Sequence, residues 1–350
     1  MRRAFSSATV SSLLLILATA LLLRAVRGYR PFPSVDDFAY VPLARAAVFP
    51  HLFPQDLMVQ GFVLHAPVWT WAVRLSERWM DLPTLFWSLT ILLTVATVAG
   101  AHRLLRALGG GVLLPLLAWI ALSGRVNGVM RGQYEGLVGD SFHVQWLALG
   151  LLLWAYAAFV ERKAVLSGIL LGLAAISHPV VALHGAFVIL VAGVLRRWGG
   201  GVIRSGLAAI AVSAAVSIPL VLQLVRTRAD IGVPASWLVE FGYLFRTPHE
   251  FSLEYTTPTE LTFLGLVVVV GAAGALLLLR GTGGDRVKAL IGMLLGHSLL
   301  VGSALLVHGP WAAGGDVVET STFPFLLHLS RTSPMLLVVG ATLALGAVES

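Results

Sequence analysis

The sequence predicts an all-α membrane protein, a polytopic bundle of about ten transmembrane helices. Hydrophobic residues make up 57% of the 350 residues and charged residues only 12%, whereas soluble domains carry roughly 25% charge. Runs of about 18 apolar residues recur along the chain, each long enough to cross a bilayer as a helix. The strand alternation of outer-membrane barrels is absent. We expect one transmembrane domain over residues 1–350, which could be truncated because its last apolar run ends at Glu349-Ser350.

Ten apolar runs are the expected spans. They cover residues 10–26, 84–101, 110–123, 142–160, 164–178, 180–195, 202–225, 261–280, 287–308 and 334–348. The first follows Met1-Arg2-Arg3 like a signal sequence, but it continues through Leu21-Leu22-Leu23 beyond the small residues that could be cleaved. We therefore expect an uncleaved first helix.

The fifth and sixth runs meet at Ser177-His178-Pro179. Proline removes a backbone donor and disfavours helix at the residue before it. Two short helices that meet at a polar turn are tolerated where the turn is buried in protein or faces an aqueous cavity. We expect such a pair, and the alternative is a single kinked span.

Basic residues lie in short turns on alternate sides of the expected spans. If the N-terminus is cytoplasmic, the inner segments are Arg2-Arg3, His102 to Arg106, Glu161-Arg162-Lys163, Arg196 to Arg204, and Arg280 to Lys288. The opposite side holds longer loops with most of the acidic residues. Positive charge in short loops faces the cytoplasm, so we expect a cytoplasmic N-terminus in a bacterial inner membrane.

The first outer loop, residues 27–83, is long for an unstructured connection. Its stretches Tyr40 to Val48 and Pro67 to Met80 have amphipathic helical character, and Trp69, Trp71 and Trp79 suit a membrane interface. We expect amphipathic helices there.

Asp36 and Asp37 open this loop, a few residues after the first span. Two adjacent carboxylates can hold a divalent cation, or one can act as a base that the other orients. An aspartate also caps helices well, so the structural alternative is a cap for a helix that begins near Phe38. We favour a catalytic role for both aspartates, with Mg²⁺ or Mn²⁺ as the candidate cofactor.

The chain resembles the GT-C class of integral-membrane glycosyltransferases, which use polyprenyl-phosphate sugars. The resemblance rests on a basic N-terminus, one span and Asp36-Asp37 in the first outer loop. Further similar pieces are Leu52 to Asp56, Gly168 to Gly172, Arg246-Thr247-Pro248-His249 and Leu329-Ser330-Arg331. It implies a GT-C-like fold, a polyprenyl-phosphate sugar donor, and Asp36 and Asp37 as the catalytic or metal-binding pair.

Further polar residues fall on the expected outer side. Glu135 and Asp140 could complete a metal or acceptor site, or could simply solvate and cap a loop. His178 and His249 could donate to a phosphate or ligate a metal, or could simply be hydrogen-bonded near the membrane interface. Arg131, Arg246 and Arg331 could bind the donor phosphate through bidentate hydrogen bonds, or anchor the loops at the interface.

Several classes are excluded or disfavoured. The chain has no cysteine, and therefore no disulfide and no thiolate site. It has no HExxH zinc motif and no phosphate-binding P-loop. The net charge of +7 lies at span ends and does not indicate nucleic acid. Alternatives to a transferase are an ion-coupled transporter or flippase-like carrier, and a non-catalytic assembly subunit.

Overall fold

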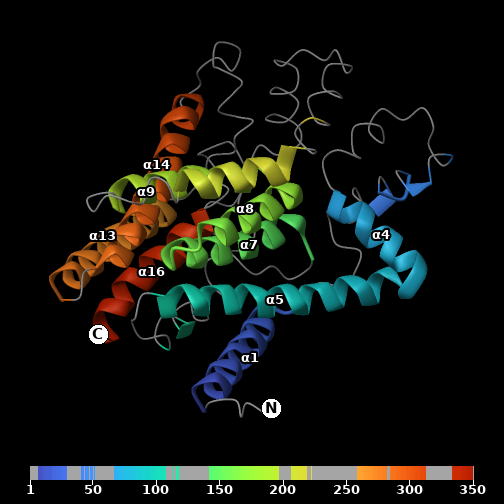
Figure 1. Ribbon diagram of the computed structural model, residues 1–350, viewed down its shortest axis with the longest axis horizontal. Helices are drawn as coiled ribbons and strands as arrows, with labels where there is room; N and C mark the ends of the chain where they lie inside the picture. The colour runs from blue at the N-terminus through green and yellow to red at the C-terminus, as the bar shows by residue number, and fades with distance from the viewer. Residues whose placement is uncertain are drawn as a thin grey trace.

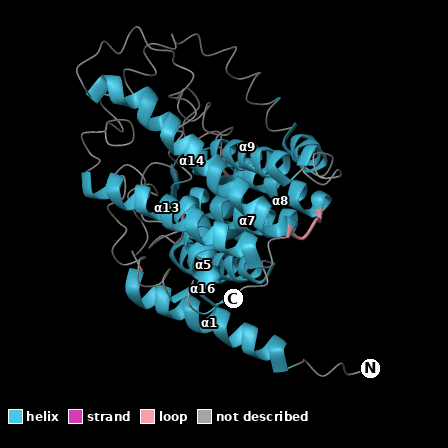
Figure 2. Ribbon diagram, turned by 90° about the vertical axis from the view of Figure 1, so that its left-hand side faces the viewer, coloured by secondary structure: helices cyan, strands magenta, loops and turns pink. Residues whose placement is uncertain are grey.

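The computed structural model of the chain describes residues 7–29, 41–42, 44–46, 48–49, 51, 67–107, 113, 116–117, 142–196, 206–218, 222, 258–281, 284–312 and 333–349. Within these ranges the chain is helical, with short turns and no strand. The helices are α1 (Ser7–Arg27), α4 (Pro67–Trp79), α5 (Leu82–Ala107), α7 (Val144–Val160), α8 (Ala164–Ser177), α9 (Pro179–Arg196), Gly206–Ile218, α13 (Pro258–Gly281), α14 (Asp285–Ala312) and α16 (Ser333–Glu349). In Figures 1 and 2, α1 lies at one edge, and α5, α7 and α9 follow in layers.

The helices begin and end where the sequence offers capping groups. α1 ends at Gly28, whose φ of +72° suits a residue without a Cβ, and the Gly28 N–H bonds the Arg24 carbonyl at 2.8 Å. Asp81 caps α5 by accepting hydrogen bonds from the N–H and hydroxyl of Thr84. These local signals explain why the predicted runs became separate helices.

The expected pair of short helices around His178 is confirmed. α8 ends at Ser177, and α9 begins at Pro179, where the missing N–H of proline is harmless. The far ends of both helices meet the end of α7: Lys163 precedes α8 directly, and Arg196 at the end of α9 bonds the Phe159 carbonyl at 2.9 Å. The alternative of one kinked span is wrong, because a single span would carry its two ends to opposite sides.

Side-chain contacts fix the directions of the helices. α5 and α7 run parallel, because Trp154 donates to the Ala96 carbonyl at 2.8 Å while Arg103 reaches Glu161 beyond the end of α7. α1 runs antiparallel to α5, since Arg106 near the end of α5 bonds Ser12 near the start of α1. These directions agree with the alternation that the basic turns predicted.

Glycines bring helices into very close contact. A Cβ on Gly292 of α14 would lie 2.4 Å from the Ala192 Cα of α9, and a Cβ on Gly172 of α8 would lie 2.6 Å from the Val216 Cβ. Small residues at such crossings are typical of helix packing in membranes, where backbones approach closely. The apolar core joins residues of α1, α5, α7, α8, α9, α13, α14 and α16.

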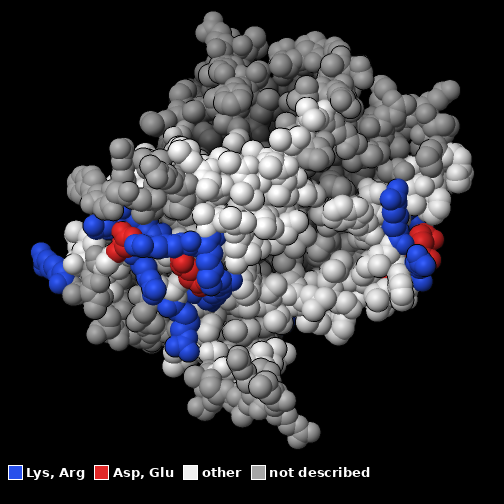
Figure 3. All heavy atoms as spheres, in the orientation of Figure 1, with Lys and Arg blue, Asp and Glu red and all other residues white. Residues whose placement is uncertain are grey.

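The apolar exterior and the charge distribution identify a membrane protein. Three helices among the described residues are long and apolar enough to cross a membrane: Thr9–Val26, Leu82–Ala107 and Pro179–Arg196. Leucines such as Leu21, Leu92 and Leu276 expose more than half of their surface. An apolar surface of this kind is unusual for a soluble protein. In Figure 3 the charged side chains of the described residues gather at two opposite ends of an uncharged face.

Helices occupy nine of the ten expected runs, and the run 110–123 lies mostly outside the described residues. The amphipathic helix expected from Pro67 to Met80 is α4. Trp71 and Trp79 are exposed as expected of interfacial residues, but Trp69 is fully buried against Phe86 and Phe142. The expectation for Trp69 is therefore wrong, because its face of α4 packs on the bundle.

Candidate functional site

The structure describes one of the predicted site residues, His178. The others lie outside the described residues: Asp36, Asp37, Arg131, Glu135, Asp140, Arg246, His249 and Arg331. The proposed Mg²⁺ or Mn²⁺ site at the two aspartates lies outside them too. Within the described ranges, no three His, Asp or Glu side chains are arranged to hold a metal ion.

His178 joins α8 to α9 in an extended conformation, with φ −153° and ψ 95°. Its N–H bonds the Ala174 carbonyl at 2.7 Å and so closes α8, while its carbonyl accepts from Ala182 in the first turn of α9. Its Nδ1 accepts a hydrogen bond from the Val181 N–H at 3.4 Å. Because the ring accepts this bond at Nδ1, it caps the first turn of α9.

The end of the bundle that holds His178 is capped by an aromatic cluster. Ser167 bonds the Ala155 carbonyl across the α7–α8 pair, and this pairing puts His178 level with the start of α7. At that start His143 accepts from the Gln145 N–H at 3.1 Å, and the ring of Trp69 in α4 lies against Phe142 and His143. We call this the α4 end. Two of the helices that begin there, α7 and α9, are each capped by a histidine.

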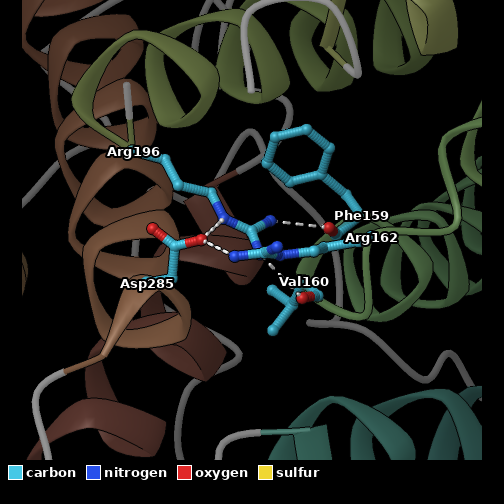
Figure 4. Close-up of polar contacts among 5 residues, drawn as sticks. All are labelled: Phe159, Val160, Arg162, Arg196 and Asp285. Atoms are coloured by element: carbon cyan, nitrogen blue, oxygen red, sulfur yellow. Dashed lines mark hydrogen bonds and ion pairs between the residues drawn. The ribbon is translucent and has the colours of Figure 1, made fainter. Parts of the chain in front are cut away.

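The opposite end is held together by ion pairs, and we call it the charged end. Arg196, which is 1% exposed, donates to the carbonyls of Phe159 and Val160 at the end of α7. Its Nε also bonds Asp285 at 3.2 Å, and Arg162 pairs with the same carboxylate (Figure 4). An arginine at a helix C-terminus and an aspartate at a helix N-terminus both complement the helix dipoles. We call Arg162, Arg196 and Asp285 the node, because their contacts hold α7, α9 and α14 together.

A second ion pair stands beside the node. Arg103 of α5 holds both oxygens of Glu161 at 2.8 and 2.7 Å, and Lys163 reaches the same carboxylate at 2.7 Å. The hydrogen bond from Arg103 lowers the pKa of Glu161 to about 2. At Asp285, partial burial works against ionisation, but hydrogen bonds from Arg162 and Arg196 hold its pKa below the ordinary value. Both carboxylates are therefore ionised at neutral pH.

Three polar side chains meet inside the bundle, where sequence reasoning did not look. The Tyr156 hydroxyl and His297 Nε2 are hydrogen-bonded at 3.0 Å, and His184 interacts electrostatically with His297. All three residues are buried, on α7, α14 and α9. The signal was available: His184 and His297 each interrupt an apolar run, and ionisable residues within spans are candidates for function.

Comparisons with known proteins return nothing for this chain. No protein-family model, no curated protein and no solved structure matches it.

Proposed function

We propose that the protein is an integral-membrane glycosyltransferase of the GT-C type, which moves a sugar from a polyprenyl-phosphate donor to an acceptor on the outer face of a bacterial inner membrane. The feature that supports the proposal is the place of Asp36-Asp37 in the sequence, shortly after α1. α1 ends at Gly28, eight residues before Asp36, and an extended chain spans at most about 3.5 Å per residue. Because α1 runs antiparallel to α5, α1 ends at the α4 end of the bundle, and we propose that the pair acts on this side.

The α4 end has further properties that suit a lipid-linked phosphate. α4 is amphipathic and presents Trp71 and Trp79 outward, as helices at a membrane interface do. The helices α5, α7 and α9 begin at this end, and their N-terminal dipoles favour an anion. His178 lies at the same end. A donor whose apolar tail stays in the bilayer would bring its phosphate to this level.

The reaction would be a displacement at the anomeric carbon. One aspartate accepts the proton of the acceptor hydroxyl as its oxygen bonds to that carbon. The bond from the carbon to the phosphate oxygen breaks, and polyprenyl phosphate leaves with the electron pair. Mg²⁺ or Mn²⁺ held by Asp36 and Asp37 would stabilise the charge on this leaving group.

Orientation follows from the charged end. The turns that hold Glu161 to Lys163 and Arg280 to Lys288 meet there, and short basic turns face the cytoplasm. We propose that the N-terminus is cytoplasmic and that the α4 end faces outward.

A second candidate, an ion-coupled carrier, is favoured by the buried Tyr156, His184 and His297. Such groups in the interior of a bundle can relay protons. Two observations weigh against it. The chain shows one broken helix pair among the described residues, and no carboxylate accompanies the three polar groups within the described interior. The third candidate is an assembly subunit, in which Asp36 and Asp37 only cap helices.

The deciding experiment measures transfer and donor binding with purified protein in detergent, using a short-chain polyprenyl-phosphate sugar with and without Mg²⁺ or Mn²⁺. We expect Asp36→Asn and Asp37→Asn, singly and together, to abolish transfer while donor binding persists. Asp81→Asn is the matched control, because it removes a carboxylate at the same end and asparagine still caps α5. Full transfer by the double variant would refute the catalytic role of the pair. Absence of donor binding in every protein would instead favour the carrier, and proton-driven uptake would then be measured with His297→Asn.

A further inference from the structure

The charged end carries far more positive than negative charge. Among the described residues, three acidic residues belong to this end: Glu161 and Asp285, and Glu349 at the end of α16, which runs parallel to α13. The basic side chains there are Arg103, Arg106, Arg162, Lys163, Arg196, Arg280, Arg286 and Lys288. Glu161 is already engaged by Arg103 and Lys163, and Asp285 by Arg162 and Arg196. The surplus of positive charge therefore has no internal counterpart among the described acids.

Three arginines of this surplus belong to the adjoining ends of α5, α7 and α14, which contacts of Arg103, Arg162 and Arg286 link to one another. Arg286 donates to the Ala107 carbonyl, the last of α5, at 3.0 Å. The preceding residue of α5, Arg106, reaches Ser12 at 3.3 Å. Arg162 pairs with Asp285, the residue before Arg286, and both Arg162 and Arg286 repel the buried Arg196 electrostatically. Arg106, Arg162 and Arg286 form what we call the arginine cluster.

The arginine cluster is accessible and retains hydrogen-bonding capacity. Arg106 and Arg286 are exposed, and the Arg162 side chain is 67% exposed. A guanidinium carries five N–H donors, and the contacts described here use one donor of each arginine. Arg162 also adopts φ +65°, a left-handed conformation that disfavours residues with a Cβ. The turn therefore holds an arginine at a position where glycine is the residue of lowest energy.

The dipoles of the helices that end here offset part of the positive charge. The C-termini of α5 and α7 each present about half a negative charge, and Arg286 and Arg196 already bond their carbonyls. Arg106, Arg162 and Arg286 are nevertheless exposed, each with one described contact, at the level where the apolar helices end. Lipid phosphates lie at this level, and guanidinium binds phosphate through paired hydrogen bonds.

We propose that the arginine cluster is a binding site for the phosphate of an anionic phospholipid headgroup, which supplies the negative charge that the charged end lacks. The site lies at the opposite end of the bundle from α4, and its existence is independent of the proposed transferase activity.

The test is the thermal unfolding midpoint of the full chain in dodecyl maltoside, titrated with phosphatidylglycerol, phosphatidylcholine or inorganic phosphate. We expect phosphatidylglycerol to raise the midpoint saturably, and the other two to leave it unchanged. Each basic residue at an anionic lipid surface contributes about 1 kcal/mol, which is about fivefold in affinity. The midpoint concentration for phosphatidylglycerol should therefore rise about fivefold in Arg106→Gln or Arg286→Gln and more in the triple Arg106→Gln, Arg162→Gln, Arg286→Gln variant.

Arg74→Gln is the matched control, because Arg74 is an exposed arginine of α4 at the other end, and its affinity should equal that of the wild type. Arg106→Gln alone keeps the test decisive if the triple variant fails to fold, since the contact of Arg106 with Ser12 lies at the surface. Unchanged phosphatidylglycerol affinity in Arg106→Gln and Arg286→Gln would overturn the proposal. An equal shift with phosphatidylcholine, or with inorganic phosphate, would overturn the anionic headgroup as the ligand.

Discussion

Asp285→Asn is the substitution that probes the node of the charged end most sharply. It keeps the shape of the side chain at the start of α14 and removes its charge. Arg196, which is 1% exposed, then loses its only described carboxylate partner. The positive charge of Arg196 would stay inside the bundle, held by the carbonyls of Phe159 and Val160.

The expected loss of stability follows from burial. Removing one partner of a fully buried ion pair costs about 3–5 kcal/mol. Two facts reduce this figure: the Asp285 side chain is 29% exposed, and Arg196 keeps its two carbonyl acceptors. The aspartate also complements the N-terminal dipole of α14, an effect of about 0.5 kcal/mol. Together these considerations predict a loss of about 2 kcal/mol in the free energy of unfolding.

The assay is reversible unfolding in mixed micelles of dodecyl maltoside and sodium dodecyl sulfate, followed by circular dichroism. Glu77→Gln is the matched control, because Glu77 pairs with Arg45 at 3.1 Å while both side chains are about half exposed. An exposed pair contributes about 0.5 kcal/mol. If Asp285→Asn cost no more than Glu77→Gln, the node would not be a structural tie and our reasoning from burial would be wrong.

Three further predictions concern the same framework. Because Arg103 lowers the pKa of Glu161 from 4.5 to about 2, the stability that Glu161 contributes should be complete above about pH 5 and lost as the pH falls toward 2. The difference in unfolding free energy between wild type and Glu161→Gln should shrink over that range. A difference that grew as the pH fell would contradict this prediction. At Arg162, with φ +65°, replacement by glycine should be about 1 kcal/mol more stable than replacement by alanine, and equal stabilities would show that the turn relaxes. Gly292→Ala would place a Cβ 2.4 Å from a backbone atom of α9, whereas a Cβ on Gly302 of the same helix would meet nothing within 4 Å. Thermal melting should show Gly292→Ala destabilised by about 2 kcal/mol or more. Gly302→Ala should be as stable as the wild type or more stable.

The sequence was sufficient to locate the helices because their signals are local. Apolar runs of helical length, proline at position 179 and the basic turns defined α5, α8 and α9 before any packing was known. α5 extends six residues beyond the predicted end at 101, because His102 to Ala107 continue the helix into the charged end. The prediction followed hydropathy, and the last residues of α5 are less apolar than the rest although they still form helical hydrogen bonds.

Contacts between distant segments could not be read in this way. Arg196 and Asp285 are 89 residues apart, and a helical pattern does not reveal which face meets which neighbour. Tyr156 and His297 are 141 residues apart for the same reason. For the candidate site, the sequence pointed to His178 as a phosphate donor, a metal ligand or an ordinary hydrogen-bonded residue, but only the structure shows that its ring caps α9. The aspartate pair stays a prediction.

The claim on which both proposals stand is that the charged end and the α4 end face opposite sides of the membrane. The chain contains no cysteine, so single cysteines can report each side without background. We would introduce Gly284→Cys in the exposed turn before α14 and Arg74→Cys on α4, and label each with a membrane-impermeant maleimide in intact cells and in inverted vesicles. We predict labelling of Arg74→Cys in cells only and of Gly284→Cys in inverted vesicles only. Labelling of both from the same side would contradict the topology, and with it the outward position of Asp36 and Asp37.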